Sequence, residues 1–254
     1  FYQWNIDLLG VEAPSADTEM VTIACLLLKR LGLTPDQATV KLSDRAGLGD
    51  LLRTRLNVAE AQVQPVFAAI DRVDKIPPET FTSELEAIGF SAGQVEDLRG
   101  ILADSDPAFS PRLEQMLDGL ALNGVASFVE VDRKIVRGFD YYTSTVFEAW
   151  AKTTLRRALF GGGRYDNLTL QVGGKRQVAG VGFAVGDMAL TELLKELEVL
   201  PDLKPSGAQV LVTVFSQELA EASSELAREL RQLGAAVELY LEPGGKFDKQ
   251  LRYA

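Results

Sequence analysis

The feature that most constrains this chain is a strand-like stretch at residues 135–150, followed by three consecutive glycines at residues 161–163. The stretch is rich in aromatic and β-branched residues, which favour strands. Arg137 stands just before its two tyrosines, and strand alternation would place Tyr141 and Tyr142 on opposite faces of a sheet. Glycines let a backbone approach a ligand or another strand closely. A sheet face that carries arginines, tyrosine hydroxyls and bare backbone would suit a small polar anion. The alternative, a core hairpin with a tight glycine turn, would leave the neighbouring arginines without a role.

The composition excludes several classes of function. The chain has 254 residues, enough for one large domain or two, and its net charge of −10 argues against a general nucleic-acid binder while leaving room for a local basic face. It contains no histidine, which excludes histidine-based triads and histidine-ligated zinc. Its single cysteine, Cys25, lies in an apolar run and is expected to pack in the core. Because no apolar run approaches the ~20 residues of a membrane helix, we expect a cytoplasmic protein with no membrane span.

The first fifty residues predict a strand, a helix and a second strand. Polar and apolar residues alternate from residue 1 to residue 10, so Gln3 and Asp7 share one strand face. The chain then turns into a helix, with Asp17 as its expected cap and Gly32 as its end. Residues 39–43 predict a short strand.

The sequence pattern changes at residues 51–124, which predict a helical insertion in which helices are joined by polar breaks. One break ends at Ser110 and Pro111, a capping residue followed by proline at the first helical position. Nothing in this region converges on chemistry.

Strands and glycines return at residues 125–200. Strands are expected at residues 127–132, 140–151, 159–164 and 178–183, and the last of them runs into a helix at residues 187–197. Glycines at positions 180, 182 and 186 punctuate that junction. Their spacing, G-x-G-x-x-x-G, differs from the dinucleotide fingerprint, and no βαβ unit surrounds them, which argues against a nucleotide-dependent oxidoreductase.

The C-terminal part reads as a separate, incomplete domain. Residues 201–207 are rich in proline and short polar residues and predict a linker. A strand at 209–215, a helix at 217–233 and a strand at 236–241 then form a βαβ pattern. A further helix begins at residue 246. We therefore expect a partial α/β domain at residues 208–254.

Two long motifs give the chain a specific resemblance. VRGFDYYTSTVFEAW, residues 136–150, and GGGRYDNL, residues 161–168, are similar in this order to the two signature motifs of histidyl-tRNA synthetases. GVGFAVGDMAL, residues 180–190, resembles the third motif of class II synthetases. The resemblance covers most of the chain and is loosest in the helical middle.

The resemblance implies an α+β fold of the class II synthetase type. Residues 1–50 and 125–200 would form a mixed, mostly antiparallel sheet flanked by helices. The helical insertion in this family helps to hold the tRNA acceptor end, and residues 208–254 would be part of an anticodon-binding-type domain. Phe1-Tyr2-Gln3 matches the tail of the family's Arg-x-Phe-x-Gln pattern, so we expect a fragment that lacks an N-terminal part and the end of its last domain. A homodimer is expected by family.

The implied activity is ATP-dependent activation of histidine and its transfer to histidine tRNA, with Mg²⁺ accompanying ATP. Arg137 would be catalytic, since its guanidinium can bind the α-phosphate and the histidine carboxylate together. Asp7 and Tyr142 would bind the two imidazole nitrogens, Gln3 the amino group, and Tyr141 would form the pocket wall. The residues expected to bind ATP are Arg137, Gly161, Gly162, Gly163, Arg164, Gly182 and Gly186, and no metal-ligating residue is expected.

One departure from the family pattern keeps an alternative open. Many members have Gly-x-Glu-Arg-Leu in the third motif, where the arginine holds ATP, but Ala189 stands at the arginine position here. A catalytically inactive relative serves as the regulatory subunit of ATP phosphoribosyltransferase in histidine biosynthesis, and the loss favours that alternative. Intact Arg137 and the βαβ segment oppose it.

Overall fold

The structure is a computed structural model that describes residues 2–201, 207–244 and 246–253. The chain divides into two compact units, Phe1–Leu200 and Pro201–Ala254. The predicted linker, residues 201–207, lies mostly outside the described residues.

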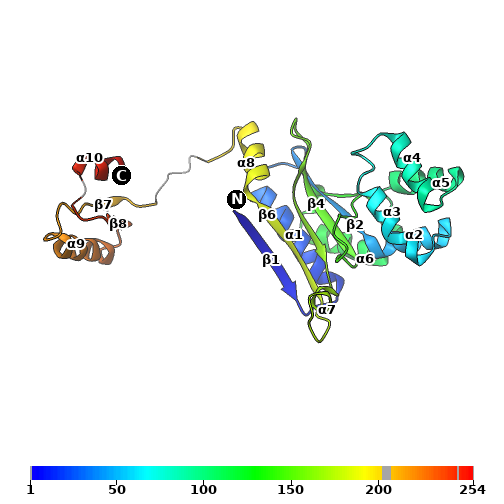
Figure 1. The fold of residues 1–254 in the computed structure, drawn as a ribbon, viewed down its shortest axis with the longest axis horizontal. Coiled ribbons are helices and arrows are strands. Elements are labelled where there is room, and N and C mark those ends of the chain that lie inside the picture. Colours follow the sequence, from blue (N-terminus) through cyan, green and yellow to red (C-terminus); the bar gives the residue numbers. More distant parts are fainter. Residues whose placement is uncertain (1, 202–206, 245, 254) are drawn as a thin grey trace. The chain divides into compact units, whose positions relative to one another are not determined.

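The first unit is built on a six-stranded sheet (Figure 1). Its strand order is β1-β6-β5-β4-β2-β3, and every neighbouring pair is antiparallel except β2 and β3. The prediction of a mixed, mostly antiparallel sheet is thereby confirmed. The strands are β1 Gln3–Leu9, β2 Ala38–Asp44, β3 Val129–Val131, β4 Thr145–Ala151, β5 Ala158–Arg164 and β6 Gly180–Gly186.

The three consecutive glycines lie within β5, between its two neighbours, and not in a turn. β5 pairs with β4 on one side and with β6 on the other. A Cβ at Gly162 would stand 2.0 Å from the carbonyl oxygen of Gly182, and one at Gly163 would stand 2.5 Å from that of Thr145. The strand expected at residues 159–164 is thereby confirmed, and the alternative of a core hairpin with a tight glycine turn is wrong, because these glycines allow three strands to approach one another closely.

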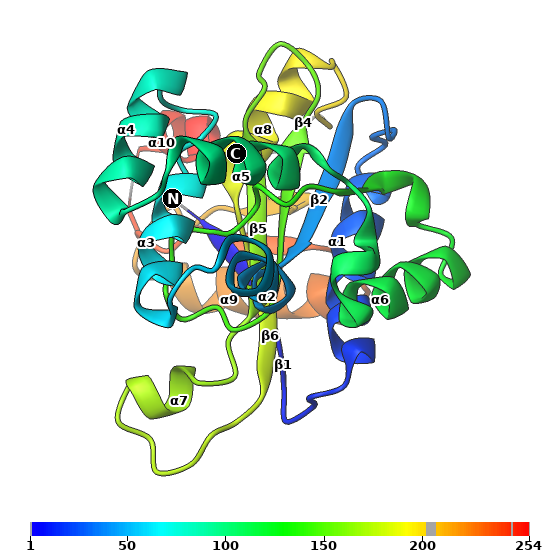
Figure 2. The same cartoon turned by 90° about the vertical axis from the view of Figure 1, so that its right-hand side faces the viewer.

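One face of the sheet is covered by α1 Pro14–Arg30, α6 Pro111–Leu122 and α8 Asp187–Glu196. Figure 2 shows α1 and α6 together on one side of the strands. Their apolar sides meet the strands in a core that includes Leu28, Met116, Phe147 and Leu193. Cys25 is fully buried in this core, as predicted.

The helices of residues 45–103 form a second, smaller core. They are α2 Arg45–Leu56, α3 Glu60–Ile70, α4 Pro78–Ile88 and α5 Ala92–Ala103. Their buried side chains pack with one another and with Val136. Within the predicted insertion α6 differs, because it packs with α1 on the sheet. Ser110 caps α6 as predicted, since its hydroxyl accepts from the Leu113 N–H at 3.1 Å.

Two local predictions are wrong. Asp17 does not cap α1, which begins at Pro14. It lies one turn inside the helix and is fully buried. The strand predicted at residues 140–151 begins only at Thr145. The residues before it are irregular and include a turn in which the Tyr142 N–H donates to the carbonyl of Phe139.

The second unit contains the predicted βαβ arrangement. β7 Val210–Val212 and β8 Val237–Leu239 are parallel and are joined through α9 Ala220–Gln232, while α10 Phe247–Tyr253 follows. The strands are shorter than predicted. The short elements of the first unit are η1 Pro107–Phe109, η2 Ala126–Phe128 and α7 Leu168–Gln171. Within the described ranges, no helix combines the length and apolar character that crossing a membrane requires.

Candidate active site

A pocket of about 530 Å³ lies on the sheet face opposite α1, and we call it the central pocket. It is formed by alternate residues of β1, by residues of β5 and β6, by the irregular segment before β4, and by Tyr165 and Leu168 after β5. The side chains of Ile6 and Leu8 pack against the core, so their neighbours on β1 face the pocket. The lining residues are Gln3, Asn5, Asp7, Arg137, Phe139, Tyr141, Tyr142, Ala158, Leu159, Phe160, Gly161, Tyr165, Leu168, Gly182, Phe183 and Ala184.

Gln3 and Asp7 line the central pocket together, as the period-2 pattern of β1 predicts. The Tyr165 hydroxyl donates a hydrogen bond to Oδ1 of Asp7, which fixes the carboxylate against β6. Burial raises the pKa of Tyr165, and the bond to Asp7 raises that pKa further, so the phenol remains a neutral donor. Tyr165 and Asn5 were missed as site residues. Asn5 could have been found from its strand position between Gln3 and Asp7.

Tyr141 and Tyr142 both line the central pocket, although strand alternation predicted opposite faces. They lie in a turn before β4, and their ring centroids are 4.5 Å apart. Phe139 stacks on Tyr141 with a centroid distance of 5.2 Å. Burial raises the pKa of Tyr142, so its hydroxyl also stays protonated. The aromatic wall of the pocket is therefore made by a turn and not by a strand face.

Arg137 extends into the central pocket and forms an ion pair with Glu148 of β4. The indole N–H of Trp150 donates to the other oxygen of Glu148 at 2.9 Å. Burial acts to lower the pKa of Arg137, but Glu148 and Tyr142 outweigh it, and the pKa is raised above its ordinary value. Its Nε is buried and has no hydrogen-bond partner in the described part of the chain. Arg137 is thus a cation that Glu148 holds at the central pocket.

Arg164 does not reach the central pocket, contrary to the role predicted for it. Its side chain is fully buried, and Nε and Nη2 donate to the two carboxylate oxygens of Asp17 at 2.9 and 3.0 Å. Nη1 donates to Asp166 and to the carbonyl of Val11. These bonds join β5 to α1 through the interior, so the guanidinium holds the fold together.

The predicted ATP-binding glycines fall into two groups. Gly161 and Gly182 line the central pocket, and a Cβ at Gly161 would stand 3.0 Å from Nη1 of Arg137. Gly162 and Gly163 separate paired strands, and Gly186 lies at the start of α8 outside the pocket lining. Ala189 packs in the sheet core with an exposed fraction of 9% and offers no polar group to a ligand.

The family model described as histidyl-tRNA synthetase matches residues 1–190 of this chain. The chain belongs to the histidyl-tRNA synthetase family. The resemblance inferred from the two motifs is thereby confirmed, and the central pocket is made largely by those two motifs and β1.

Curated relatives agree over nearly the whole chain. "Histidine--tRNA ligase, chloroplastic/mitochondrial" of Arabidopsis thaliana is 34% identical over 255 residues, covering 95% of this chain and 51% of that protein. The "Histidine--tRNA ligase" of Natronomonas pharaonis is 33% identical, covering 100% of this chain and 61% of that protein. The chain therefore spans only about half to three-fifths of the length of these relatives.

Solved structures show the same fold. The histidyl-tRNA synthetase from Nostoc sp. PCC 7120 has a TM-score of 0.72 and 24% identity, covering 99% of this chain and 63% of that one. A Bacillus halodurans protein described as "ATP phosphoribosyltransferase regulatory subunit/histidyl-tRNA synthetase" has a TM-score of 0.66 and 23% identity, covering 99% and 66%. At these identities the likeness shows the fold alone.

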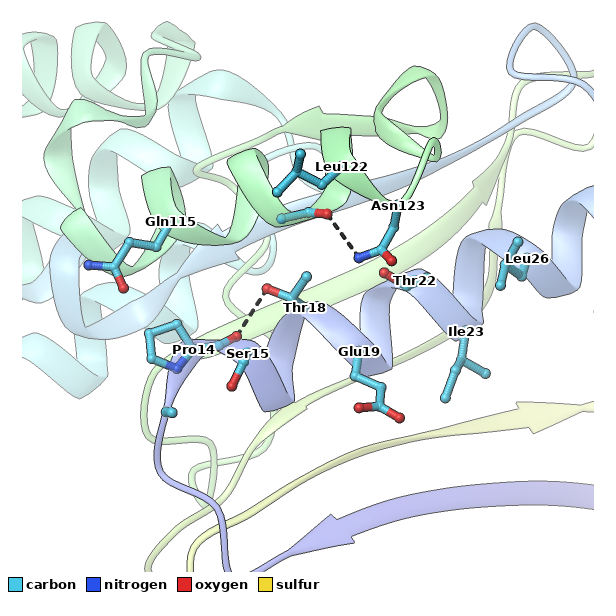
Figure 3. Close-up of a pocket in the computed structure, with 12 residues that line it drawn as sticks. Pro14, Ser15, Thr18, Glu19, Thr22, Ile23, Leu26, Gln115, Leu122 and Asn123 are labelled. Carbon is cyan, nitrogen blue, oxygen red and sulfur yellow. Dashed lines mark hydrogen bonds between the residues drawn. The ribbon is translucent and has the colours of Figure 1, made fainter.

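A larger hollow of about 790 Å³ lies between α1 and α6 (Figure 3). Its described lining contains one ionisable side chain, Glu19, and none of the predicted site residues. The hydrogen bonds drawn there, from Thr18 to the Pro14 carbonyl and from Asn123 to the Gly119 carbonyl, stay within one helix each. The central pocket, which gathers charged and phenolic groups, is therefore the candidate active site of this synthetase-family chain.

Proposed function

We propose that this chain forms the histidine- and ATP-binding part of a histidine–tRNA ligase. The observation that carries the proposal is the convergence of Asp7, Tyr142 and Arg137 on one pocket of about 530 Å³. Asp7 lies on β1, whereas Arg137 and Tyr142 lie in the irregular segment before β4, at least 130 positions later in the sequence. The family membership of the chain supports the same assignment.

The proposed reaction begins with attack of the histidine carboxylate on the α-phosphorus of ATP. A new carboxyl-oxygen-to-phosphorus bond forms as the bond to the bridging oxygen breaks, which gives histidyl-adenylate and releases pyrophosphate. The acyl group then passes to a terminal ribose hydroxyl of histidine tRNA and AMP leaves. Because the attacking carboxylate is already ionised, the first step needs positioning and charge stabilisation more than a base.

Arg137 is the group proposed to stabilise charge in that step. Its ion pair with Glu148 orients the guanidinium at the central pocket, and its charge is proposed to stabilise a phosphate or carboxylate oxygen there. Gly161 leaves open the space beside Nη1 that a side chain would fill, and Gly182 does the same beside Asp7. Both glycines are proposed to accommodate ATP or histidine on bare strand backbone.

The recognition of histidine is assigned to β1 and the tyrosines. Since Tyr165 donates to Oδ1 of Asp7, Oδ2 remains available to accept from an imidazole N–H. Tyr142, a neutral phenol, is proposed to address the other ring nitrogen, Gln3 the amino group, and Tyr141 the wall of the site. A site that bonds both ring nitrogens rejects analogues lacking them by roughly 10⁴–10⁵.

Mg²⁺ would neutralise the phosphates of ATP when bound. The described residues contain no group of three or more acidic, histidine or cysteine side chains that could hold a metal ion, so we assign the ion no protein ligands. A cytoplasmic homodimer, tRNA contacts by the helical insertion and an anticodon-binding role for the second unit remain part of this proposal by family.

The decisive assay is histidine-dependent exchange of pyrophosphate into ATP by the full-length protein. Arg137→Lys keeps the charge but loses the planar fork, so we expect the adenylation rate to fall by ~10²–10³ while histidine binding persists. Arg157→Lys is the matched control, because Arg157 is exposed and pairs with Glu192 on the surface. A variant Arg137→Lys that turns over normally but unfolds at a lower temperature would show that the Glu148 pair is only structural.

A regulatory subunit of ATP phosphoribosyltransferase is the second candidate. Ala189 favours it, because the position of the family's ATP-binding arginine offers no polar group. The combined name of the Bacillus halodurans neighbour links the two functions only for that protein. Absence of exchange by the full-length protein, together with its binding to an ATP phosphoribosyltransferase, would support this candidate over the ligase.

A further inference from the structure

Residues 136–139 carry Arg137 to the central pocket, and we call them the Arg137 segment. They have no regular secondary structure. Arg137 itself has a φ of 60°, a conformation that non-glycine residues adopt at a cost. Such a backbone persists only where the surrounding structure holds it. The group that holds it is a buried arginine outside the central pocket.

Arg45, the first residue of α2, is that group, and its exposed fraction is 3%. Its Nη1 donates to three carbonyl oxygens of the Arg137 segment: those of Phe139 at 2.8 Å, Val136 at 3.1 Å and Arg137 at 3.4 Å. Hydrogen bonds from a charged donor are stronger than neutral ones. One nitrogen therefore gathers the carbonyls on both sides of the strained residue.

The other end of the same guanidinium is anchored in the helical insertion. Nη2 of Arg45 donates to the side-chain oxygen of Gln64 on α3 at 2.9 Å. The guanidinium carbon lies 4.9 Å from the ring centroid of Phe67, also on α3. Burial lowers the pKa of Arg45, while Asp140 and Asp71 act in the opposite sense. Arg45 thus bridges α3 and the Arg137 segment.

We propose that Arg45 is a positioning residue for adenylate formation, and that Gln64 orients it. By fixing the backbone of the Arg137 segment, Arg45 sets where the Arg137 guanidinium stands beside Glu148 and Gly161. A lysine would supply one ammonium and could not span the Phe139 carbonyl and Gln64 with a planar fork. The inference rests on the proposed function, because the step it assists is histidine activation.

The test compares Arg45→Lys with Arg53→Lys in the full-length protein. Arg53 lies on the same helix, is half-exposed and pairs with Asp50 at 2.7 Å and Glu60 at 2.9 Å. A displacement of about 1 Å in a reacting group can cost ~10²-fold. We therefore expect Arg45→Lys to lower kcat in single-turnover adenylate formation by ~10- to 100-fold, with KM for ATP and histidine changed by less than about 3-fold. Arg53→Lys should stay within about 2-fold of wild type in both.

A double substitution separates positioning from general destabilisation. If Arg45 acts through Arg137, then Arg45→Lys should cause little further loss of rate in an Arg137→Ala background, because the guanidinium that Arg45 positions is already absent there. A multiplicative loss in the double variant, an unchanged kcat in Arg45→Lys, or a change confined to KM would overturn the proposal.

If Arg45→Lys does not fold, Gln64→Ala replaces it as the test variant. The side chain of Gln64 is exposed, and this substitution should lower kcat by roughly 2- to 10-fold through loss of its one hydrogen bond to Arg45. A wild-type kcat in that variant overturns the proposal. If the wild-type protein shows no histidine-dependent exchange, the proposed function and the positioning role fall together, whereas an active wild type with an active Arg45→Lys removes only the latter.

Discussion

Replacement of Asp17 by asparagine should cost the first unit about 3 kcal/mol of unfolding free energy. Asp17 and Arg164 are both fully buried, and two bonds of 2.9 and 3.0 Å join them. Arg112 forms an ion pair with the same carboxylate. Asparagine keeps one acceptor oxygen but presents an N–H₂ to the second arginine nitrogen, so the buried Arg164 guanidinium loses one of its two counter-charges.

The magnitude follows from what each partner retains. Breaking a buried ion pair by altering one member typically costs ~3–5 kcal/mol. The lower end applies here because Arg164 keeps Asp166 at 2.9 Å and the Val11 carbonyl at 3.0 Å. In a domain of this size each 1 kcal/mol shifts the melting temperature by roughly 2–4 °C, so a fall of roughly 6–12 °C is expected.

The assay is urea and thermal unfolding followed by circular dichroism, with Glu19→Gln as the matched control. Glu19 lies on the same helix and is exposed, so this control should stay within about 0.5 kcal/mol of wild type. An Asp17→Asn variant as stable as that control would refute the structural role of the pair. If that variant also bound ATP weakly, Arg164 would regain the ATP-binding role that its sequence motif predicted.

Three further predictions concern the histidine site, the strand glycines and the buried thiol. Asp7→Asn should raise KM for histidine at least about ten-fold, because Tyr165 still has an acceptor while the imidazole N–H loses a charged one; an unchanged KM would remove Asp7 from the histidine site. Gly182→Ala should cost ~1–3 kcal/mol in urea unfolding, since its Cβ would stand 2.3 Å from Oδ1 of Asp7 and 2.5 Å from the carbonyl oxygen of Ile6. Gly186→Ala, with nothing within 4 Å, should cost at most about 1 kcal/mol, and equal losses in the two variants would contradict this steric reasoning. Burial raises the pKa of the Cys25 thiol from 9.0 to about 12, which disfavours its ionised form in the fold. The unfolding free energy should therefore be unaffected by this group below pH 9 and fall as the pH rises toward 12, by up to about 1.4 kcal/mol per pH unit, and Cys25→Ala should abolish that part of the slope.

Short-range patterns predicted the site residues that lie on regular elements. Gln3 and Asp7 reach the central pocket together because side chains of a strand repeat every two residues. The same rule gave the wrong faces for Tyr141 and Tyr142, since both precede β4 and lie in a turn in which the Tyr142 N–H donates to the carbonyl of Phe139. The strand propensity of the residue types in this stretch does not reveal such a turn.

Arg164 and Tyr165 show a second limit. The motif GGGRYDNL points to both residues, and a charge next to glycines suggested the arginine as the ligand-binding one. In the fold β5 turns Arg164 inward to Asp17, and it is Tyr165 that lies at the pocket beside Asp7. The direction of a side chain at the end of a strand is decided by the partner it finds, and that partner is 147 positions away.

The sequence by itself determined the family, the mostly antiparallel sheet, the βαβ segment near the C-terminus and the Arg137 motif, because each is written in local periodicity or in contiguous residues. Only the tertiary structure decided that the glycines separate strands, that Arg164 is a core residue, and that Arg45 of α2 holds the Arg137 segment at a sequence distance of 91 to 94 positions. Buried charges bind whichever opposite charge or carbonyl the packed chain brings within reach, since leaving them unpaired costs several kcal/mol. The partner of each buried charge therefore depends on the whole fold and cannot be read from a local sequence pattern.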